Sequence, residues 1–165
     1  MKYLKYLLLL ILATLIFLKI NDMYKKEKTI IIKGATINEL WEAHSDVKNW
    51  SKWQDDIEWT KVEGEVKKGT KFIIKPKGGF KVTLEILTFN KPEQFTDVSY
   101  LPFCKMFTTT KMKEVENGVE IKLEIEMKGL LTFLWKNIIA KDIINGHLEQ
   151  NKSMVNYIHS LKNDK

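Results

Sequence analysis

The sequence has no arginine, because all 27 of its basic residues are lysine. Arginine supplies the planar, bidentate group with which many proteins recognise bases and phosphates, so its absence argues against nucleic-acid binding. Of the net charge of +6, residues 1–33 hold +5, and the rest of the chain holds only +1. A nucleic-acid-binding protein would carry its positive charge on the folded domain. We therefore expect no nucleic-acid partner.

Cysteine and histidine are scarce, with one Cys and three His in 165 residues. Cys104 alone can form neither an intramolecular disulfide nor a cysteine metal cluster, and we interpret it as a small buried residue. The three histidines have no spacing typical of a metal site, and no Ser/His/Asp arrangement can be proposed from the sequence. The sequence therefore predicts no metal, no cofactor and no catalytic residue.

One long hydrophobic run stands at the N-terminus. After Lys5, residues 7–18 read LLLLILATLIFL, with no charge before Lys19. Twelve apolar residues fit a signal-peptide core better than a full membrane span of about 20 residues, but no small-residue cleavage site follows. We favour an uncleaved single-pass anchor over residues 4–20 at the cell membrane, with the flanking lysines reaching the interfaces. The alternative is export after signal cleavage, and the lysine distribution leaves the side of the membrane open.

The length allows one domain behind this N-terminal membrane segment. We assign residues 1–27 to a hydrophobic anchor or signal segment with a basic flank, and residues 28–165 to a single folded domain. The apolar content of 44% is sufficient for a hydrophobic core.

The domain begins with a pattern of one strand and two short helices. The β-branched run TIIIK at residues 29–33 predicts a strand. The segment TINE at residues 36–39 is a capping box that opens a short helix. Ser45 and Asp46 offer a second N-cap, for a short helix that holds Trp50 and Trp53.

Antiparallel strands and a long helix follow. We expect strands at residues 56–62, 70–75, 80–87, 94–101, 104–113 and 119–128. From about residue 130 to 161 the chain reads as one helix without proline. A helix of about 30 residues is about 45 Å long, enough to cross the concave side of a sheet. The sequence thus predicts an α+β helix-grip fold, a curved antiparallel sheet of six to seven strands wrapped on a long C-terminal helix.

With this order of elements the sequence resembles the START-like or SRPBCC superfamily, in particular its polyketide cyclase/dehydratase and lipid transport branch. The resemblance covers about residues 29–161 and rests on DVKNWSKW at 46–53, GTKF at 69–72 and KGLL at 128–131. It implies a helix-grip fold with a ligand cavity between the long helix and the sheet. It does not imply one chemistry, because members include lipid carriers, hormone receptors and cyclases.

One departure from the family pattern concerns catalysis. Many relatives have a His on the strand that here carries Thr108, Thr109 and Thr110, and this chain has no ionisable group there. The side chains expected to face inward from this strand are Cys104, Met106, Thr108, Thr110 and Met112. Such a wall suits an apolar ligand better than acid–base chemistry, which needs a group that titrates near neutral pH.

Several polar or unusual residues are candidates for the cavity. His147 and Asn151 lie four residues apart on the apolar stripe of the long helix, where they can bond to the sheet or to a ligand head group. Gly146 costs about 0.8–1.0 kcal/mol in mid-helix, so it marks either close packing on the sheet or empty volume. Trp50 and Trp53 form either a lid or a core plug. The predicted ligand-binding residues are Trp50, Trp53, Phe72, Ile74, Val82, Leu84, Met106, Thr108, Thr110, Met112, Gly146, His147 and Asn151.

The other two histidines are interpreted as structural or solvated. His44 sits at the C-terminal end of the first short helix, where the helix dipole favours a protonated imidazole. His159 lies near the chain end and is expected to be solvated.

The leading hypothesis is binding or carriage of a small hydrophobic molecule, such as a lipid, at a membrane surface. Lysines beside the hydrophobic segment favour a position near an anionic leaflet. Two alternatives stay open. One is an enzyme of the cyclase/dehydratase type that acts by shaping a bound substrate, and the other is a stress-response or scaffold domain whose cavity is filled by its own side chains.

Overall fold

The computed structural model describes residues 2–20 and 23–163 of the chain. Its helices and strands are α1 (Lys2–Ile20), β1 (Met23–Ile32), α2 (Ile37–Ser45), the 3₁₀ helix η1 (Val47–Lys52), β2 (Ile57–Val62), β3 (Lys71–Pro76), β4 (Val82–Asn90), β5 (Gln94–Leu101), β6 (Cys104–Val115), β7 (Gly118–Lys128), α3 (Thr132–Trp135), the π-helical turn η2 (Lys136–Ala140) and α4 (Lys141–Asn163).

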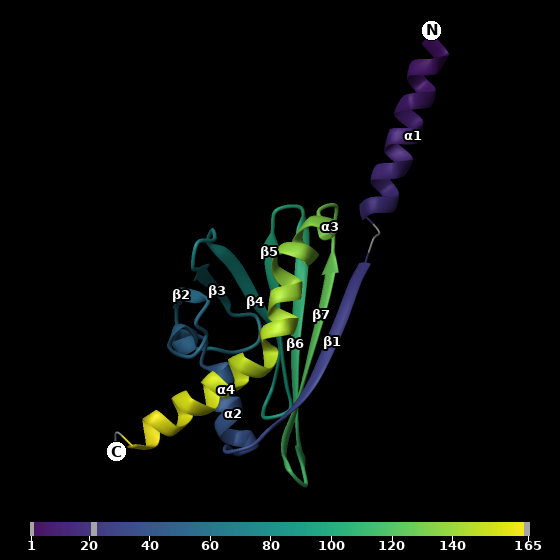
Figure 1. The fold of residues 1–165 in the computed structure, drawn as a ribbon. Coiled ribbons are helices and arrows are strands. Elements are labelled where there is room, and N and C mark those ends of the chain that lie inside the picture. Colours follow the sequence, from purple (N-terminus) through teal and green to yellow (C-terminus); the bar gives the residue numbers. More distant parts are fainter. Residues whose placement is uncertain (1, 21–22, 164–165) are drawn as a thin grey trace.

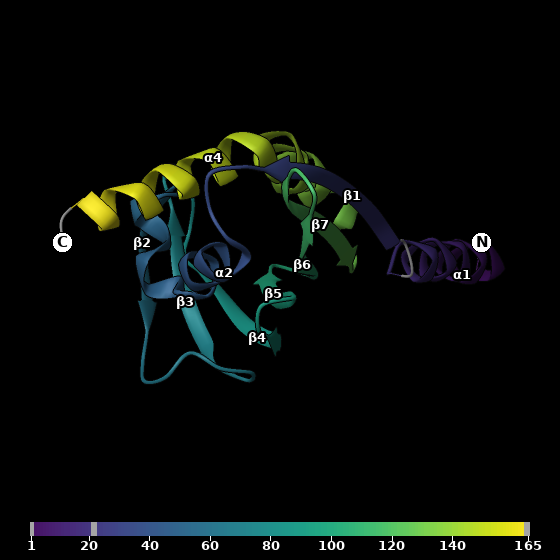
Figure 2. The ribbon, with the colours of Figure 1, turned by 90° about the horizontal axis from the view of Figure 1, so that it is seen from below.

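The strands form one antiparallel sheet in the order β1-β7-β6-β5-β4-β3-β2. The helices α2 and η1 connect its two edge strands, β1 and β2 (Figure 1). The sheet curves strongly, and α4 runs across its concave side (Figure 2). The predicted α+β helix-grip architecture, with a seven-stranded sheet and a long C-terminal helix, is thereby confirmed for the described residues.

The strand pattern places the core between the sheet and the helices. β7 alternates strictly, so that Ile121, Leu123, Ile125 and Met127 are buried while Lys122, Glu124 and Glu126 are partly exposed. The helices contribute further fully buried side chains, among them Leu40, Trp41, Val47 and Met154. Cys104 is also buried, as predicted.

Some expected strand boundaries were wrong. β4 spans Val82–Asn90 and not residues 80–87. β1 begins at Met23, well before residue 29, because its pairing with β7 continues as far as Met23 opposite Lys128. Lysines on both faces are tolerated there because β1 is an edge strand, where charged residues also discourage pairing with another chain. The helix expected over residues 130–161 is present and runs without a gap from Thr132 to Asn163, with the π-helical turn η2 between α3 and α4.

The capping box predicted at residues 36–39 is present. The Thr36 hydroxyl accepts a hydrogen bond from the Glu39 backbone N–H at 3.3 Å, and the Glu39 carboxylate accepts one from the Thr36 N–H at 2.8 Å. The second cap differs from the prediction, since Asp46 makes no side-chain bond to the N-terminal amides of η1. Its carboxylate accepts a hydrogen bond from the Asn49 side chain at 2.6 Å instead.

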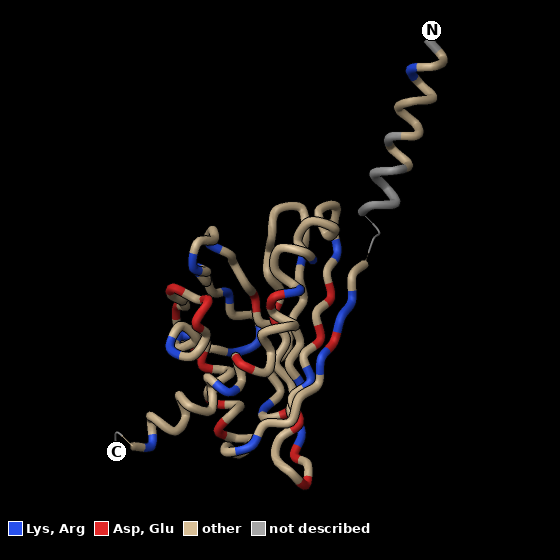
Figure 3. Tube along the Cα trace, viewed as in Figure 1, with Lys and Arg blue, Asp and Glu red and all other residues tan. Residues whose placement is uncertain are grey.

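The N-terminal helix α1 extends away from the sheet in Figure 1. Its large side chains from Tyr3 to Ile11 are 48–88% exposed. Within the described residues, no helix combines the length and the apolarity needed to cross a membrane. In the folded domain, charges of both signs alternate along β1 and β7 (Figure 3), and Lys122 forms an ion pair with Glu27 at 2.9 Å across these two strands.

Candidate functional site

A cavity of about 670 Å³ lies between the concave face of the sheet and α4. Strands β3 to β7 provide its floor, η2 and α4 cover it, and residues of α2, η1 and the following loop close one end. Ligand pockets in proteins typically have volumes of about 300–1,000 Å³. The cavity is therefore large enough for a small organic molecule.

The structure brings eleven of the thirteen predicted ligand-binding residues together in the wall of this cavity. They are Trp50, Trp53, Ile74, Val82, Leu84, Met106, Thr108, Thr110, Gly146, His147 and Asn151. Phe72 and Met112 are buried but do not line it. The ring of Trp50 stands edge-on to Phe72 at 5.4 Å, and Met112 lies farther along β6, the strand that α2 contacts.

Trp50 and Trp53 form part of the fixed wall. Trp50 is 6% exposed, and its indole N–H donates a hydrogen bond to the backbone carbonyl of His44 at 2.7 Å. Trp53 is 3% exposed, and its Nε1 is buried without a hydrogen-bond partner among the described residues. Of the two predicted roles, this geometry fits a core plug with one face on the cavity.

His44 lines the cavity next to these tryptophans, and its expected protonation was wrong. Its ring stands edge-on to Phe95, with centroids 5.2 Å apart. Burial, together with the nearby His147, lowers the pKa of His44 to about 4, so its imidazole is neutral at physiological pH. Desolvation of the cation outweighs the helix dipole at this position. His159 is exposed, as expected, and its Nε2 lies 2.6 Å from the carbonyl oxygen of Gly34.

His147 and Asn151 face the sheet from α4 as a hydrogen-bonded pair. The amide nitrogen of Asn151 donates to Nδ1 of His147 at 3.1 Å and to the His147 carbonyl oxygen at 2.7 Å. Nε2 of His147 then carries the proton, 3.4 Å from the carbonyl oxygen of Ile121. Burial lowers the pKa of His147, which is 2% exposed. Both ring nitrogens thus have partners within the protein, which fits the structural interpretation of this histidine.

Gly146 is exposed and belongs to the lining of the cavity, and it borders open space. A Cβ built at this position would meet no atom within 4 Å outside its own helix backbone and chain neighbours. Two explanations were considered for this glycine in the middle of the helix. The observation supports empty volume and contradicts close packing of the helix on the sheet.

Two polar residues of the cavity wall, Asp97 and Ser99, were not predicted. Both point inward from β5 and are 4% and 3% exposed. Asp97 lies opposite Thr108 of β6, and Ser99 lies opposite Met106. Burial raises the pKa of Asp97 to about 8, so its carboxyl group is largely protonated at neutral pH. The alternation of side chains along the strand could have found them, because Asp97 and Ser99 lie on the same face of β5 as the apolar Leu101.

The mouth of the cavity combines aromatic and acidic side chains. Phe80, at 45% exposure, packs edge-on against Trp135, with ring centroids 5.6 Å apart. Gln150 of α4 donates a hydrogen bond to Gln54 at 3.0 Å, which joins the helix to the loop after η1. The charged lining residues at the mouth are the exposed ones, Asp55, Asp56, Lys77, Asp142 and Glu149.

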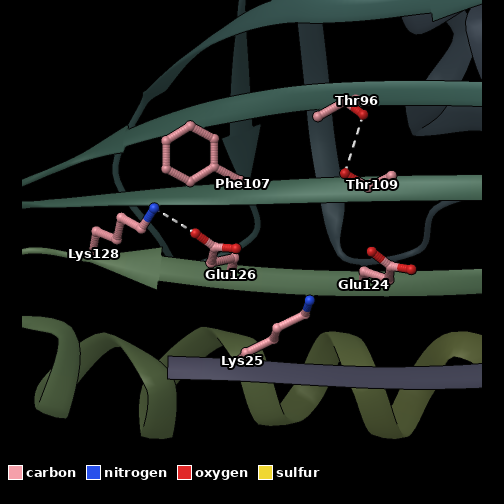
Figure 4. A pocket seen from close by; sticks show the side chains of 7 residues that line it. All are labelled: Lys25, Thr96, Phe107, Thr109, Glu124, Glu126 and Lys128. Carbon is pink, nitrogen blue, oxygen red and sulfur yellow. Dashed lines mark hydrogen bonds and ion pairs between the residues drawn. The ribbon is translucent and has the colours of Figure 1, made fainter. Parts of the chain in front are cut away.

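A second, smaller depression of about 220 Å³ lies on the outer face of the sheet (Figure 4). Lys128 lies 2.6 Å from Glu126, and Glu124 forms ion pairs with Lys111 and Lys122. The hydroxyls of Thr96 and Thr109 are also hydrogen-bonded, at 3.1 Å. Most of its polar groups thus have partners, and it lacks the apolar lining of the inner cavity. Within residues 2–20 and 23–163, no group of three or more His, Cys, Asp or Glu side chains could hold a metal ion.

Solved structures share the arrangement of the curved sheet around a long C-terminal helix. The crystal structure of Ara h 8.0201 matches with a TM-score of 0.69 at 16% identity, over 84% of this chain and 99% of that chain. The chain has the helix-grip fold. A hypothetical protein from Helicobacter pylori matches the same helix-grip domain with a TM-score of 0.63 at 17% identity, over 83% of this chain and 88% of that one.

An enzyme also shares the helix-grip fold. Norcoclaurine synthase from Thalictrum flavum, solved in complex with dopamine and hydroxybenzaldehyde, matches with a TM-score of 0.64 at 12% identity, over 86% of this chain and 89% of that chain. By sequence, no protein-family model and no curated protein matches this chain. Identities this low show the fold expected for the START-like or SRPBCC superfamily and do not distinguish its branches. The polyketide cyclase/dehydratase and lipid transport branch therefore stays a prediction.

Proposed function

We propose that this protein binds or carries a small, largely apolar molecule, such as a lipid, in the cavity between its sheet and α4. The observation that carries the proposal is the open volume of about 670 Å³, walled by aromatic and aliphatic side chains with a few inward polar groups. Such a combination is typical of small-molecule sites. The alternative of a domain whose cavity is filled by its own side chains is inconsistent with this volume.

The enzyme alternative has less support from the lining residues. Burial lowers the pKa values of His44 and His147, and both ring nitrogens of His147 are engaged within the protein. A general acid or base needs a group that exchanges a proton near the working pH and can reach the substrate. Asp97 has the first property, so turnover of a bound compound is an outcome that a binding experiment must allow for.

The membrane part of the proposal rests on the sequence of α1 and its flank. The helix exposes its apolar side chains from Leu7 to Ile11, and Lys25, Lys26 and Lys28 follow on β1. Apolar surface together with basic residues favours association with an anionic lipid surface. We propose that residues 1–20 hold the protein at a membrane, where an apolar ligand would be supplied.

Native mass spectrometry of the gently purified full-length protein tests the proposed function. We expect a co-purifying molecule in a 1:1 complex, or uptake of the neutral fluorescent probe N-phenyl-1-naphthylamine with one site per chain. Gly146→Leu, which fills part of the cavity from α4, should reduce this occupancy, whereas Glu116→Gln in the turn between β6 and β7 should not. An empty protein that takes up no apolar probe would refute the proposal.

A further inference from the structure

Asp97 places a carboxyl group in the cavity wall that the protein leaves without a partner. The residue is 4% exposed, and its carboxyl group forms no hydrogen bond or ion pair with any residue that the structure describes. An isolated buried carboxylate loses its hydration at a cost of several kcal/mol unless a positive group or hydrogen-bond donors replace the water. A ligand that supplies the missing positive charge would offset this cost.

The mouth of the cavity also has more negative than positive groups. Asp55, Asp56 and Asp142 are exposed and form no ion pair within the described residues. Among the described residues that line the cavity, Lys77 is the only lysine. Glu149 is compensated by Lys152 at 2.8 Å. This acidic surplus runs against the net charge of the whole chain, which is +6. A cleft lined by one sign of charge concentrates ligands of the opposite sign.

Aromatic rings also line the cavity. Trp50 and Trp53 belong to its wall, and Phe80 and Trp135 pack together in the same wall. The faces of such rings attract cations, by about 0.5–1 kcal/mol at exposed sites and more where water is excluded. They also accept the apolar part of a ligand, so they fit a molecule that has both properties.

We propose that the cavity prefers cationic amphiphiles, small apolar molecules with one basic or quaternary nitrogen that is placed against Asp97. This inference rests on the proposed function and specifies its ligand class. A fatty acid or another anionic amphiphile would meet the acidic mouth with the same sign of charge, and it could form no ion pair with Asp97. Such ligands should therefore bind more weakly than cations of the same size.

A matched pair of probes tests the preference. Benzyltrimethylammonium and neopentylbenzene have nearly the same shape and differ in a charged nitrogen against a neutral carbon. Binding to the full-length protein can be followed by the fluorescence of the tryptophans in the cavity wall. Because Asp97 must lose its proton to pair with the cation, affinity for benzyltrimethylammonium should rise about tenfold per pH unit below pH 8. From pH 6 to 8 the rise should be about 50-fold, whereas neopentylbenzene should bind with equal affinity throughout.

Other titratable groups face the same cavity and define the controls. His44 of α2 and His147 of α4 have lowered pKa values, and the groups at the mouth are Asp55, Asp56, Lys77, Asp142 and Glu149. Asp97→Asn keeps all of them and should abolish the rise in affinity with pH. Glu116→Gln makes the matching acid-to-amide replacement outside the cavity lining and should leave the rise intact. Circular dichroism establishes that both variants are folded.

The outcomes separate the two proposals. If neopentylbenzene binds and benzyltrimethylammonium shows no rise with pH in the wild type, the cation preference is overturned and the proposed function stands. The cation preference is likewise overturned if Asp97→Asn keeps the rise. If neither probe binds, the proposed function itself fails. If Asp97→Asn does not fold, the inference is still tested by the change with pH in the affinity of the wild type for benzyltrimethylammonium.

Discussion

Gly146→Ala should stabilise the protein without closing its cavity. The added methyl group would enter open space, since a Cβ at this position meets no atom within 4 Å. Alanine is more favourable than glycine in the interior of a helix by about 0.8–1.0 kcal/mol. In a domain of this size we expect the gain to raise Tm by about 3–5 °C.

Gly146→Leu probes the same space with a larger side chain. Leucine also favours the helix, so this variant should fold at least as stably as the wild type. Its side chain would occupy part of the volume of about 670 Å³ and compete with a ligand. We expect N-phenyl-1-naphthylamine to bind about tenfold more weakly, which corresponds to about 1.4 kcal/mol.

The matched control is Gly129→Ala. Gly129 has a φ of +137°, and a Cβ there would lie 2.4 Å from the carbonyl oxygen of Phe103. The same chemical change should therefore destabilise this position by at least about 1–3 kcal/mol. Thermal unfolding by circular dichroism, with and without the probe, measures all three variants. Loss of stability in both Gly146 variants, without selective loss of probe binding, would refute the empty volume beside Gly146.

Three further predictions concern single groups. His147→Gln should change affinity for a neutral probe by less than about threefold. The pH profile of the variant should match that of the wild type, because burial lowers the pKa of His147 and both ring nitrogens have partners within the protein. Loss of a measurable turnover with intact binding would instead favour the enzyme alternative. Hydrogen bonds from Lys162 and Thr36 lower the pKa of Glu39 to about 2. The wild type should therefore be more stable than Glu39→Gln above pH 4.5, and this difference should vanish as the pH falls towards 2. Urea unfolding measures the difference, and a difference independent of pH would contradict the prediction. The full-length protein should begin at Met1 and sediment with membranes until detergent is added, and recovery of a soluble form starting near residues 21–26 would count against the tether.

The fold could be predicted because its signals are local. The alternation along β7 reports directly which face is buried, and the capping box at residues 36–39 needs only the four residues that form it. The boundary errors arose where pairing with a distant strand decided the outcome. β1 begins at Met23 because β7 offers backbone partners that far, although the sequence of residues 23–28 is mostly charged and polar.

Only part of the candidate site could be predicted from local sequence patterns. Met106, Thr108 and Thr110 share the inward face of β6 because side chains alternate along a strand, and parity alone places them there. Asp97 was missed because a charged residue in a strand is usually exposed to solvent. It lies inside because α4 and the curved sheet enclose the inner face of β5.

The sequence by itself determined the order of strands and helices, the parity of their faces and the glycine in the middle of α4. Only the tertiary structure decided the volume of the cavity and the charge states within it. Asp97 holds its proton up to a pKa of about 8, and His44 stays neutral down to about 4. Both shifts arise from the removal of water by segments remote in sequence, and no short pattern of residues contains that information.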